Sequence, residues 1–173
     1  MELSVLQAAI LALYYWFAQW YIFYSAINVF LGPLCTGLFC GIVLGDIPTA
    51  MKIAATLQPM FLAFTGAGGT VVWDEAAATI VGCTVTILSG IELSQAVTIA
   101  VPVSLLCAQL HTIRRIVMVY PVQKADKYAE TCNIRGITFM AFWWPQIIKI
   151  FIYAIPMFFA LHFGAEAMGT LMN

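Results

Sequence analysis

The feature that most constrains this chain is a stretch without any charged residue, which covers residues 3–45. A water-facing surface needs charged side chains, so a stretch of this length is suited to a lipid bilayer. The whole chain agrees, because only 9% of its residues are charged and 63% are hydrophobic, whereas soluble domains are about one quarter charged. The net charge of −1 argues against nucleic acid as a partner. The sequence therefore predicts a membrane protein surrounded by lipid.

The membrane segments are predicted to be helical, because an open sheet would leave backbone groups unpaired in lipid. A complete crossing takes about 20 residues, and the apolar segments 53–64 and 76–91 are shorter than that. Gly32 and Pro33 interrupt the long uncharged stretch. We predict an all-α polytopic membrane protein, a helical bundle of roughly four to six short, re-entrant or discontinuous membrane segments. Residues 1–173 are interpreted as a single membrane domain.

Three glycines recur every fourth residue after the first interruption, at Gly37, Gly41 and Gly45. Such spacing places small residues on one helix face, so we predict that this face packs closely against a neighbouring helix. Asp46 follows at once and precedes Pro48. This pattern predicts that a new helix begins there, with the carboxylate as its cap.

The segment 56–75, "TLQPMFLAFTGAGGTVVWDE", is the least suited to a simple spanning helix. Pro59 removes a backbone donor, and the glycines within 65–69 do not favour a helix. Irregular backbone is tolerated at membrane depth only where it is buried in protein or lines a wet cavity. Asp74 and Glu75 are predicted to begin the next helix, at its positive end. The segment is therefore predicted to be a broken, re-entrant element beside a cavity.

The hydrophilic part of the chain is the segment 114–135, which carries five of its seven Lys and Arg residues. It follows the uncharged segment 93–113, which is long enough to span. The positive-inside rule predicts that residues 114–135 form a cytoplasmic loop. Lys149 lies within the last apolar segment, 136–163, where it snorkels to the interface, pairs with a carboxylate or faces a cavity. Snorkelling is the preferred interpretation.

The sequence contains no phosphate-binding loop, nucleophile elbow or zinc-binding helix motif. His111 and His162 stand alone, and His111 beside Arg114 is interpreted as a surface or interface histidine. The five cysteines form no Cys-x-x-Cys pair and are interpreted as small hydrophobic residues. We therefore predict no catalytic residue, no metal site and no cofactor.

Apart from Gln109, the remaining polar groups lie in the broken segment or at its end. An amide offers donors and an acceptor without the cost of burying a charge. Together with freed backbone groups it suits a sugar, whose hydroxyls both donate and accept. The alternative is that Gln58 bonds to a neighbouring helix and that the glycines form a turn, and the residues taken alone favour this alternative. The candidate sugar-binding residues are Gln58, Thr65, Gly66, Gly68, Gly69 and Asp74.

A series of motifs runs through the chain in a fixed order: "MELSVLQ" at 1–7, "GPLCTGLFCGIVLGD" at 32–46, "AATLQPMFLAF" at 54–64, "GAGGTVVWDEAAATIVG" at 66–82, "AVPVSLLCAQL" at 100–110 and "QKADKYAE" at 123–130. This series resembles the membrane subunit IIC of the mannose-type sugar phosphotransferase system, whose members act on mannose, fructose, sorbose or N-acetylgalactosamine. The resemblance covers essentially the whole chain. Its most specific part is the spacing between the Val-Leu-Gly-Asp and Thr-Leu-Gln blocks.

The resemblance implies an inner-membrane permease that binds a hexose or amino sugar and delivers it for phosphorylation by a cytoplasmic IIB subunit. It implies a IID membrane partner, cytoplasmic IIA and IIB subunits that relay phosphate from phosphoenolpyruvate, and an oligomer of IIC–IID heterodimers. The protein would be a component of a phosphotransferase without a phosphorylated residue of its own. Gln58 becomes the first candidate for a sugar contact, and Asp74 matches an acidic position of the family motif.

The chain departs from the family pattern at three points. Gln58 stands where some members have Glu, and Gly32 replaces the usual basic residue before Pro33. The chain also resembles only the N-terminal two thirds of a IIC subunit, which implies either a partial sequence or a short variant that needs its partner to complete the transport domain.

Two other functions remain open. One is a non-transporting membrane scaffold or partner subunit. The other is an ion-coupled secondary transporter, for which buried carboxylates would supply the ion site. The basic residues of 114–135 either dock an acidic partner such as IIB or set topology beside lipid headgroups.

Overall fold

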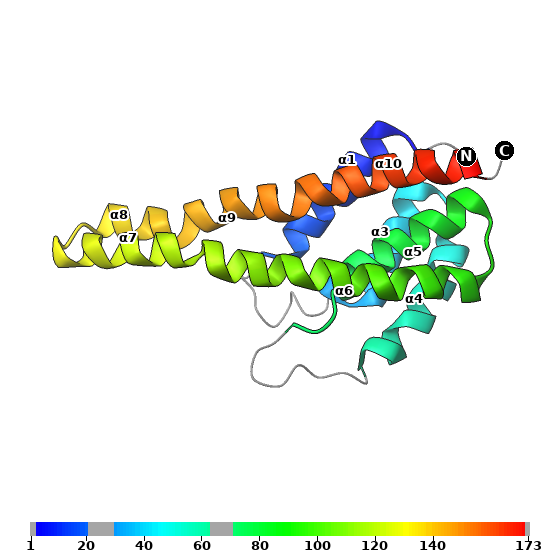
Figure 1. Cartoon of the computed structure of the whole chain (residues 1–173), viewed down its shortest axis with the longest axis horizontal. Coiled ribbons are helices and arrows are strands. Elements are labelled where there is room, and N and C mark those ends of the chain that lie inside the picture. The colour runs from blue at the N-terminus through cyan, green and yellow to red at the C-terminus, as the bar shows by residue number, and fades with distance from the viewer. Residues whose placement is uncertain (1–2, 21–29, 63–70, 172–173) are drawn as a thin grey trace.

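The computed structural model of the chain describes residues 3–20, 30–62 and 71–171, and Figure 1 shows its path. The regular structure of this described part is helical, with two short π-helical stretches, η3 and η4, among the α-helices. The elements are α1 (Val5–Ala18), α3 (Pro33–Leu44), α4 (Ile47–Leu62), α5 (Glu75–Ser89), α6 (Leu93–Val117), α7 (Val119–Glu130), α8 (Ile134–Thr138), η3 (Phe139–Trp143), α9 (Trp144–Lys149), η4 (Ile150–Ala154) and α10 (Ile155–Leu171).

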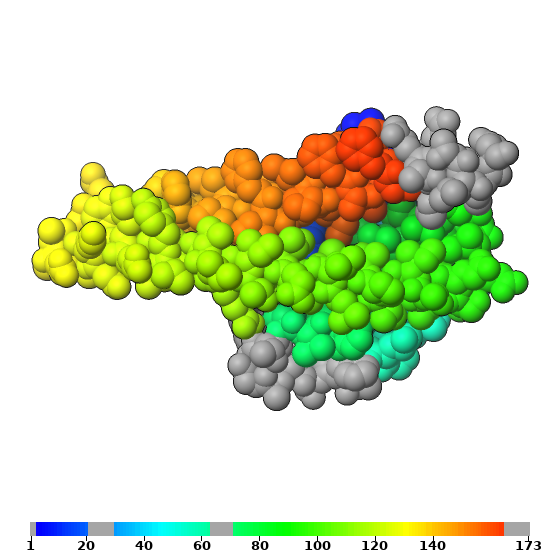
Figure 2. Space-filling view, viewed as in Figure 1, coloured from blue at the N-terminus to red at the C-terminus, as the bar shows by residue number. Residues whose placement is uncertain are grey.

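Two long helical rods run side by side along the longest axis of the molecule (Figure 1). The first rod consists of α6 and α7, and the second, which runs back, consists of α8, η3, α9, η4 and α10. At one end the rods pack against α1, α4 and α5, and α3 packs against these three helices. We call the four helices with the packed rod ends the body. At the other end α7, α8 and η3, residues 119–143, project beyond the body and form what we call the arm (Figure 2).

Nearly all of residues 114–135, the segment predicted as a cytoplasmic loop, is helical. Helix α6 continues to Val117, and α7 follows after a single residue. The chain then reverses at Cys132, whose φ of 52° lies in the left-handed region. Just beyond it, the Asn133 N–H donates to the Tyr128 carbonyl at 2.9 Å. The cytoplasmic position of the segment stays a prediction.

Close packing between α3 and α4 confirms the predicted small-residue face at two of its three glycines. A Cβ at Gly41 would lie 2.7 Å from the Ile47 Cα, and one at Gly37 would collide with the Ala54 Cβ. Both positions therefore require glycine, because the facing helix leaves no room for a side chain. Gly45 has a different role, since it ends α3 with a φ of 84°.

Helix α4 begins where the sequence predicted it, directly after Asp46. The Thr49 N–H donates to the Asp46 Oδ1 at 3.1 Å, as expected of a helix cap. The hydrogen bonds from the Thr49 side chain and backbone lower the pKa of this carboxyl, which lies in the turn before the helix. The helix then runs to Leu62 with Pro59 inside it. The predicted break that follows, within 65–69, lies outside the described residues.

The second rod changes its helical pitch twice, each time shortly before a proline. The π-helix η3 precedes Pro145, and η4 precedes Pro156. Proline lacks the N–H that an α-helix needs, so an altered turn nearby relieves the hydrogen-bond pattern. Both prolines are therefore accommodated without ending the rod.

The rods are long and apolar enough to cross a membrane, judged by length and composition over Leu93–Glu130 and Ile134–Gly164. Large apolar side chains face outward on both, for example Leu106, which is 72% exposed, and Phe151, which is 63% exposed. Exposed apolar surface of this kind suits lipid rather than water. The apolar helices α1, α3 and α5 are shorter, and α5 agrees with the short apolar segment predicted at 76–91.

Candidate functional site

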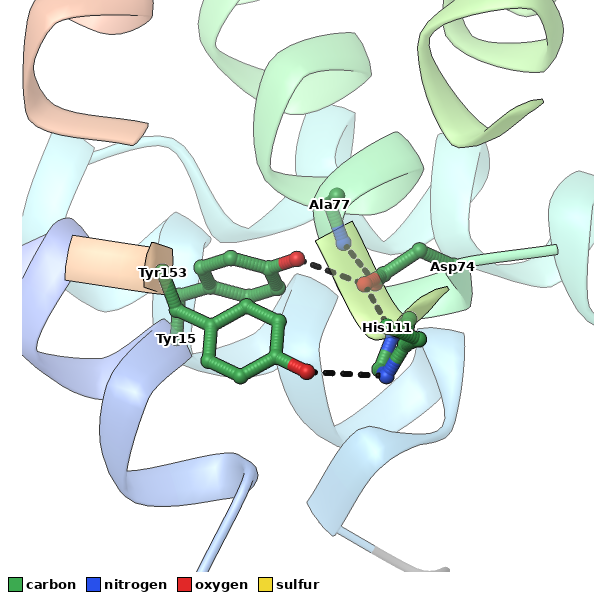
Figure 3. A network of polar contacts seen from close by, with 5 residues as sticks. All are labelled: Tyr15, Asp74, Ala77, His111 and Tyr153. Atoms are coloured by element: carbon green, nitrogen blue, oxygen red, sulfur yellow. Dashed lines mark hydrogen bonds and ion pairs between the residues drawn. The ribbon is translucent and has the colours of Figure 1, made fainter. Parts of the chain in front are cut away.

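Asp74 lies at the centre of a buried polar network in the body (Figure 3). It is the N-cap of α5, and its Oδ1 accepts a hydrogen bond from the Ala77 N–H at 2.9 Å. Its own N–H donates to the Ser104 carbonyl of α6 at 3.3 Å. Asp74 begins α5, as the sequence predicted, and in the structure it also ties that helix to α6.

The second carboxylate oxygen of Asp74 contacts two further side chains, and a third is reached through His111. Tyr15 of α1 donates its hydroxyl to the Asp74 Oδ2 at 2.5 Å, and the His111 Nε2 of α6 lies 2.9 Å from the same oxygen. The other ring nitrogen of His111 lies 3.0 Å from the hydroxyl of Tyr153 in η4. The network therefore joins α1, α5, α6 and η4 through contacts of hydrogen-bond length (Figure 3).

The network is enclosed by protein. Tyr15 and Tyr153 are fully buried, Asp74 is 3% exposed and His111 is 6% exposed. The two tyrosine rings meet edge to face, with centroids 5.6 Å apart and an angle of 89° between them, an arrangement that aromatic pairs prefer. A buried carboxylate is tolerated here because each of its oxygens accepts at least one hydrogen bond.

The donor and acceptor roles in the network follow from the chemistry of its groups. An ionised carboxylate only accepts, so His111 carries a hydrogen on Nε2 when Asp74 is charged. A tyrosine hydroxyl both donates and accepts, so Tyr153 donates to a neutral His111 and accepts from a protonated one. The same geometry thus serves both charge states of the histidine. Because both ring nitrogens are engaged and buried, His111 presents neither of them to a phosphoryl donor.

His111 corrects the interpretation of a surface or interface histidine. It faces inward from α6 because Asp74 and Tyr153 supply partners for both ring nitrogens. The sequence did not single out Tyr15 or Tyr153 either, since both sit in apolar stretches rich in aromatic residues. The available signal was a polar residue, His111, within the largely apolar segment 93–113.

Lys149 is also placed differently from the preferred interpretation. It is 3% exposed and does not snorkel. Its Nζ donates to the backbone carbonyl of Gln19 at 3.0 Å, which ties α9 to the end of α1. A carbonyl at a helix end has no partner within the helix, so the lysine supplies the donor that it needs.

Gln58 is half-buried on α4 and accepts a hydrogen bond from the Leu34 N–H at 3.3 Å. Leu34 lies in the first turn of α3, where backbone N–H groups have no partner inside the helix. Gln58 thus bonds to a neighbouring helix, as the structural alternative expected. Its contact with a sugar stays a prediction.

The other candidate residues divide into two groups. Thr65, Gly66, Gly68 and Gly69 lie outside the described residues, whereas Asp74 lies in the buried network. The two elements that flank residues 63–70 are close to each other, because the rings of Phe61 and Trp73 have centroids 6.0 Å apart. Gln58 and Asp74 therefore lie on elements that meet, although the structure records no hydrogen bond between them. Their role in binding a sugar stays a prediction.

Comparisons with known proteins agree with the resemblance found in the sequence. The family profile of the sorbose-specific IIC component of the phosphotransferase system matches residues 5–173. The fructose permease IIC component of Bacillus subtilis (strain 168) is 29% identical over 108 residues, which cover 62% of this chain and 40% of that protein. The mannose-specific EIIC component of Escherichia coli (strain K12) is 28% identical over 146 residues, which cover 82% of this chain and 53% of that protein.

A solved structure has the same fold. In the cryo-electron microscopy structure of the mannose transporter ManYZ with microcin E492, one chain superposes with a TM-score of 0.82 at 26% sequence identity. The superposition covers 98% of this chain and 66% of that chain. The chain spans about half the length of the curated relatives it matches, 40% and 53% in the two cases above. The profile match over 5–173, supported by this fold, shows that the chain is an all-α membrane protein and belongs to the family of sorbose-specific IIC components of the phosphotransferase system.

Proposed function

We propose that the chain forms the sugar-translocating part of a IIC subunit in a phosphoenolpyruvate-dependent sugar phosphotransferase system. It binds a hexose or amino sugar and delivers it for phosphorylation by a cytoplasmic IIB subunit. The observation that carries this proposal is the match of residues 5–173 to the IIC family. The similarity to a solved mannose transporter supports it. Since the chain spans only part of its relatives, transport is a property of the complete assembly.

The sugar site is proposed at the broken element between α4 and α5. Gln58 uses its Oε1 for the Leu34 N–H, and its amide Nε2 is the donor available for a sugar hydroxyl. The contact between Phe61 and Trp73 supports a defined site, because it fixes the two flanks of the element against each other. Asp74 begins the second flank. The proposed sugar-binding residues are Gln58, Thr65, Gly66, Gly68, Gly69 and Asp74.

The proposed partners are a IID membrane subunit and cytoplasmic IIA and IIB subunits, with IIC–IID heterodimers assembled into an oligomer. The proposed location is the inner membrane, with the segment 114–135 on the cytoplasmic side. The Lys and Arg residues of that segment support this orientation. A IID subunit is a reasonable partner, because the similar solved structure is of a transporter named for two components.

The proposal is tested by phosphoenolpyruvate-dependent uptake of radiolabelled sugars in vesicles that contain the protein with its IID, IIA and IIB partners. Gln58→Ala should lower uptake roughly fivefold or more, since a lost hydrogen bond to a buried hydroxyl costs about 1 kcal/mol or more. Gln95→Ala, which removes an exposed amide on α6, is the matched control and should leave uptake unchanged. Equal uptake by both variants for every sugar would remove Gln58 from the site.

The same vesicles distinguish the other two functions. An ion-coupled transporter would lose uptake when ionophores collapse the ion gradients, whereas the proposed protein keeps it as long as phosphoenolpyruvate is present. A non-transporting scaffold would give no accumulation of sugar phosphate under any condition. No contact or comparison described above favours either of these functions.

A further inference from the structure

Asp74 belongs both to the buried polar network and to the proposed sugar site, so the network and the site share one carboxylate. Asp74 is the N-cap of α5, and it directly follows Trp73, whose ring meets that of Phe61 on α4. It therefore lies at the second flank of the broken element, beside the contact that joins the two flanks. The way in which its carboxylate is held decides which oxygen a sugar can use.

The two carboxylate oxygens of Asp74 are engaged to different extents. Oδ2 lies 2.5 Å from the Tyr15 hydroxyl and 2.9 Å from the His111 Nε2. Oδ1 accepts a hydrogen bond from the Ala77 N–H at 2.9 Å. An oxygen of an ionised carboxylate accepts about two hydrogen bonds. Within the described part of the chain, Oδ2 is therefore fully used, whereas Oδ1 keeps one acceptor position (Figure 3).

Tyr15 and His111 hold Oδ2 from two helices other than α5. Tyr15 lies on α1, 59 positions from Asp74, and His111 lies on α6, 37 positions from it. Tyr15 is fully buried and His111 is 6% exposed, so close packing leaves both side chains little freedom to turn. The His111 ring is also held by Tyr153, whose hydroxyl lies 3.0 Å from Nδ1.

The orientation of the carboxylate depends on these two donors. The terminal torsion of an aspartate side chain has a broad energy profile, so the carboxylate turns easily unless both of its oxygens are held. The Ala77 N–H holds one oxygen, and Tyr15 and His111 hold the other. Removing a donor from Oδ2 would let the carboxylate turn, and the free acceptor position of Oδ1 would no longer have a fixed direction.

We propose that Tyr15 and His111 are positioning residues of the sugar site, which occupy Oδ2 of Asp74 and so leave Oδ1 as the acceptor for one sugar hydroxyl. The assignment rests on the proposed function, because it requires a sugar beside Asp74. Tyr15 and His111 do not touch the sugar and act through Asp74. A group that is already held in its binding geometry binds more tightly, because less conformational freedom is lost on binding.

The main experiment compares two tyrosines of the same network. Tyr15→Phe removes a donor from Asp74, whereas Tyr153→Phe removes a hydroxyl that reaches Asp74 only through His111. Calorimetry measures the binding of mannose, fructose, sorbose and N-acetylgalactosamine to the protein with its IID partner, well below the Tm of each variant. For a sugar that the wild type binds, Tyr15→Phe should weaken binding about tenfold, equivalent to about 1.4 kcal/mol, and Tyr153→Phe no more than about twofold.

A second set of variants tests His111. His111→Gln keeps an N–H that can donate to Asp74 and an oxygen that can accept from Tyr153, so it should retain most of the sugar affinity. His111→Leu removes the donor and should weaken binding about as much as Tyr15→Phe. His162→Leu, which removes the other histidine of the chain, is the matched control and should leave binding unchanged. The histidine variants decide the test if Tyr15→Phe does not fold.

Monodeoxy analogues of the bound sugar distinguish positioning from a general loss of structure. The analogue that lacks the hydroxyl accepted by Asp74 should bind the wild type and Tyr15→Phe with nearly equal affinity, because the contact is absent from both complexes. The other analogues should still bind Tyr15→Phe about tenfold more weakly than the wild type. A variant that is only less well folded would lose affinity for every analogue to the same extent.

Two results would overturn the positioning role while leaving the proposed function intact. One is unchanged sugar binding by Tyr15→Phe and His111→Leu. The other is an equal loss of affinity in Tyr15→Phe and Tyr153→Phe for every analogue. If the wild type with its partner bound none of the four sugars, the proposed function and the positioning role would both be wrong.

Discussion

Helix α3 of the body and helix α7 of the arm each have 12 residues, yet they are held in place by different means. Six residues of α3 are buried, whereas the only buried residue of α7 is Pro121. In the body, close helix contacts and the Asp74 network connect elements far apart in the sequence. In the arm, two neighbouring helices contact each other along their length. We therefore expect changes in the body to affect the whole protein and changes in the arm to stay local.

The strongest test of this difference is the removal of a carboxylate from each region. Asp74→Ala should lower the free energy of unfolding by about 3 kcal/mol or more, because it leaves buried His111 and Tyr15 without their acceptor. Asp126→Ala, at an exposed position of the arm, should change it by no more than about 0.5 kcal/mol. Denaturant unfolding in detergent measures both. Similar losses for the two variants would show that the body and the arm unfold as one unit.

A second test adds one methyl group to a glycine in each region. Gly41→Ala should cost about 1–3 kcal/mol, because the new Cβ meets the backbone of Ile47, which has little room to move. At Gly136 of the arm the obstacle is the side chain of Tyr128, whose Cγ would lie 2.7 Å from the new Cβ. That ring can rotate away from the half-exposed arm surface, so Gly136→Ala should cost less than about 1 kcal/mol.

Thermal unfolding of the two alanine variants against the wild type decides this second test. Alanine also favours helix over glycine by up to about 1 kcal/mol, which further reduces the expected loss in the arm. A larger loss for Gly136→Ala than for Gly41→Ala would contradict the account of helix packing given for α3 and α4.

A third and smaller effect is expected at the edge of the polar network. Tyr153→Phe removes the hydroxyl that lies 3.0 Å from the His111 Nδ1, and should lower the free energy of unfolding by about 1 kcal/mol. Tyr120→Phe removes a hydroxyl from a side chain that is 52% exposed, so it should have no measurable effect. If Tyr153→Phe were equally silent, the hydroxyl would not contribute to the network in solution.

The smallest effect on global stability is expected at the tip of the arm. Asn133 caps α8, because its Oδ1 accepts from the Gly136 N–H at 3.1 Å. Asn133→Ala should increase hydrogen exchange of the amides in α7 and α8, while the amides of α5 exchange as before. Faster exchange in α5 would show that the tip is coupled to the body.

Local patterns in the sequence predicted much of the body. Asp46 and Asp74 each begin a helix, because a short acidic side chain can bond to free N–H groups within a few residues. The spacing of Gly37 and Gly41 also predicted a packed face, because residues four positions apart lie on the same side of a helix. The all-α membrane fold followed from the scarcity of charges.

The polar partners could not be predicted, because they come from distant parts of the chain. Tyr15 and Asp74 are 59 positions apart, and Lys149 and Gln19 are 130 positions apart. A sequence shows that His111 and Lys149 are polar but not which groups the fold brings to them. Each was therefore assigned to the surface, where an unpartnered polar residue costs least.

The helical structure of the arm was not predicted either, for another reason. The charge of 114–135 predicted a cytoplasmic position and no particular secondary structure, yet the segment "QKADKYAE" at 123–130 consists mostly of good helix formers. A helix that is exposed on most sides and an irregular loop have a similar content of charged residues. Helix propensity was the signal that separates the two.

The π-helix η4 determines which side of the second rod faces the body. Four buried residues of this rod follow one another at every fourth position: Lys149, Tyr153, Met157 and Leu161. An α-helix has about 3.6 residues per turn, so a stripe with this spacing drifts around the axis. A π-helical turn, whose backbone hydrogen bonds join residues five apart, contains one extra residue and rotates the stripe back toward its original direction. Deleting one residue from η4 would therefore turn Met157 and Leu161 away from the body while leaving Lys149 in place.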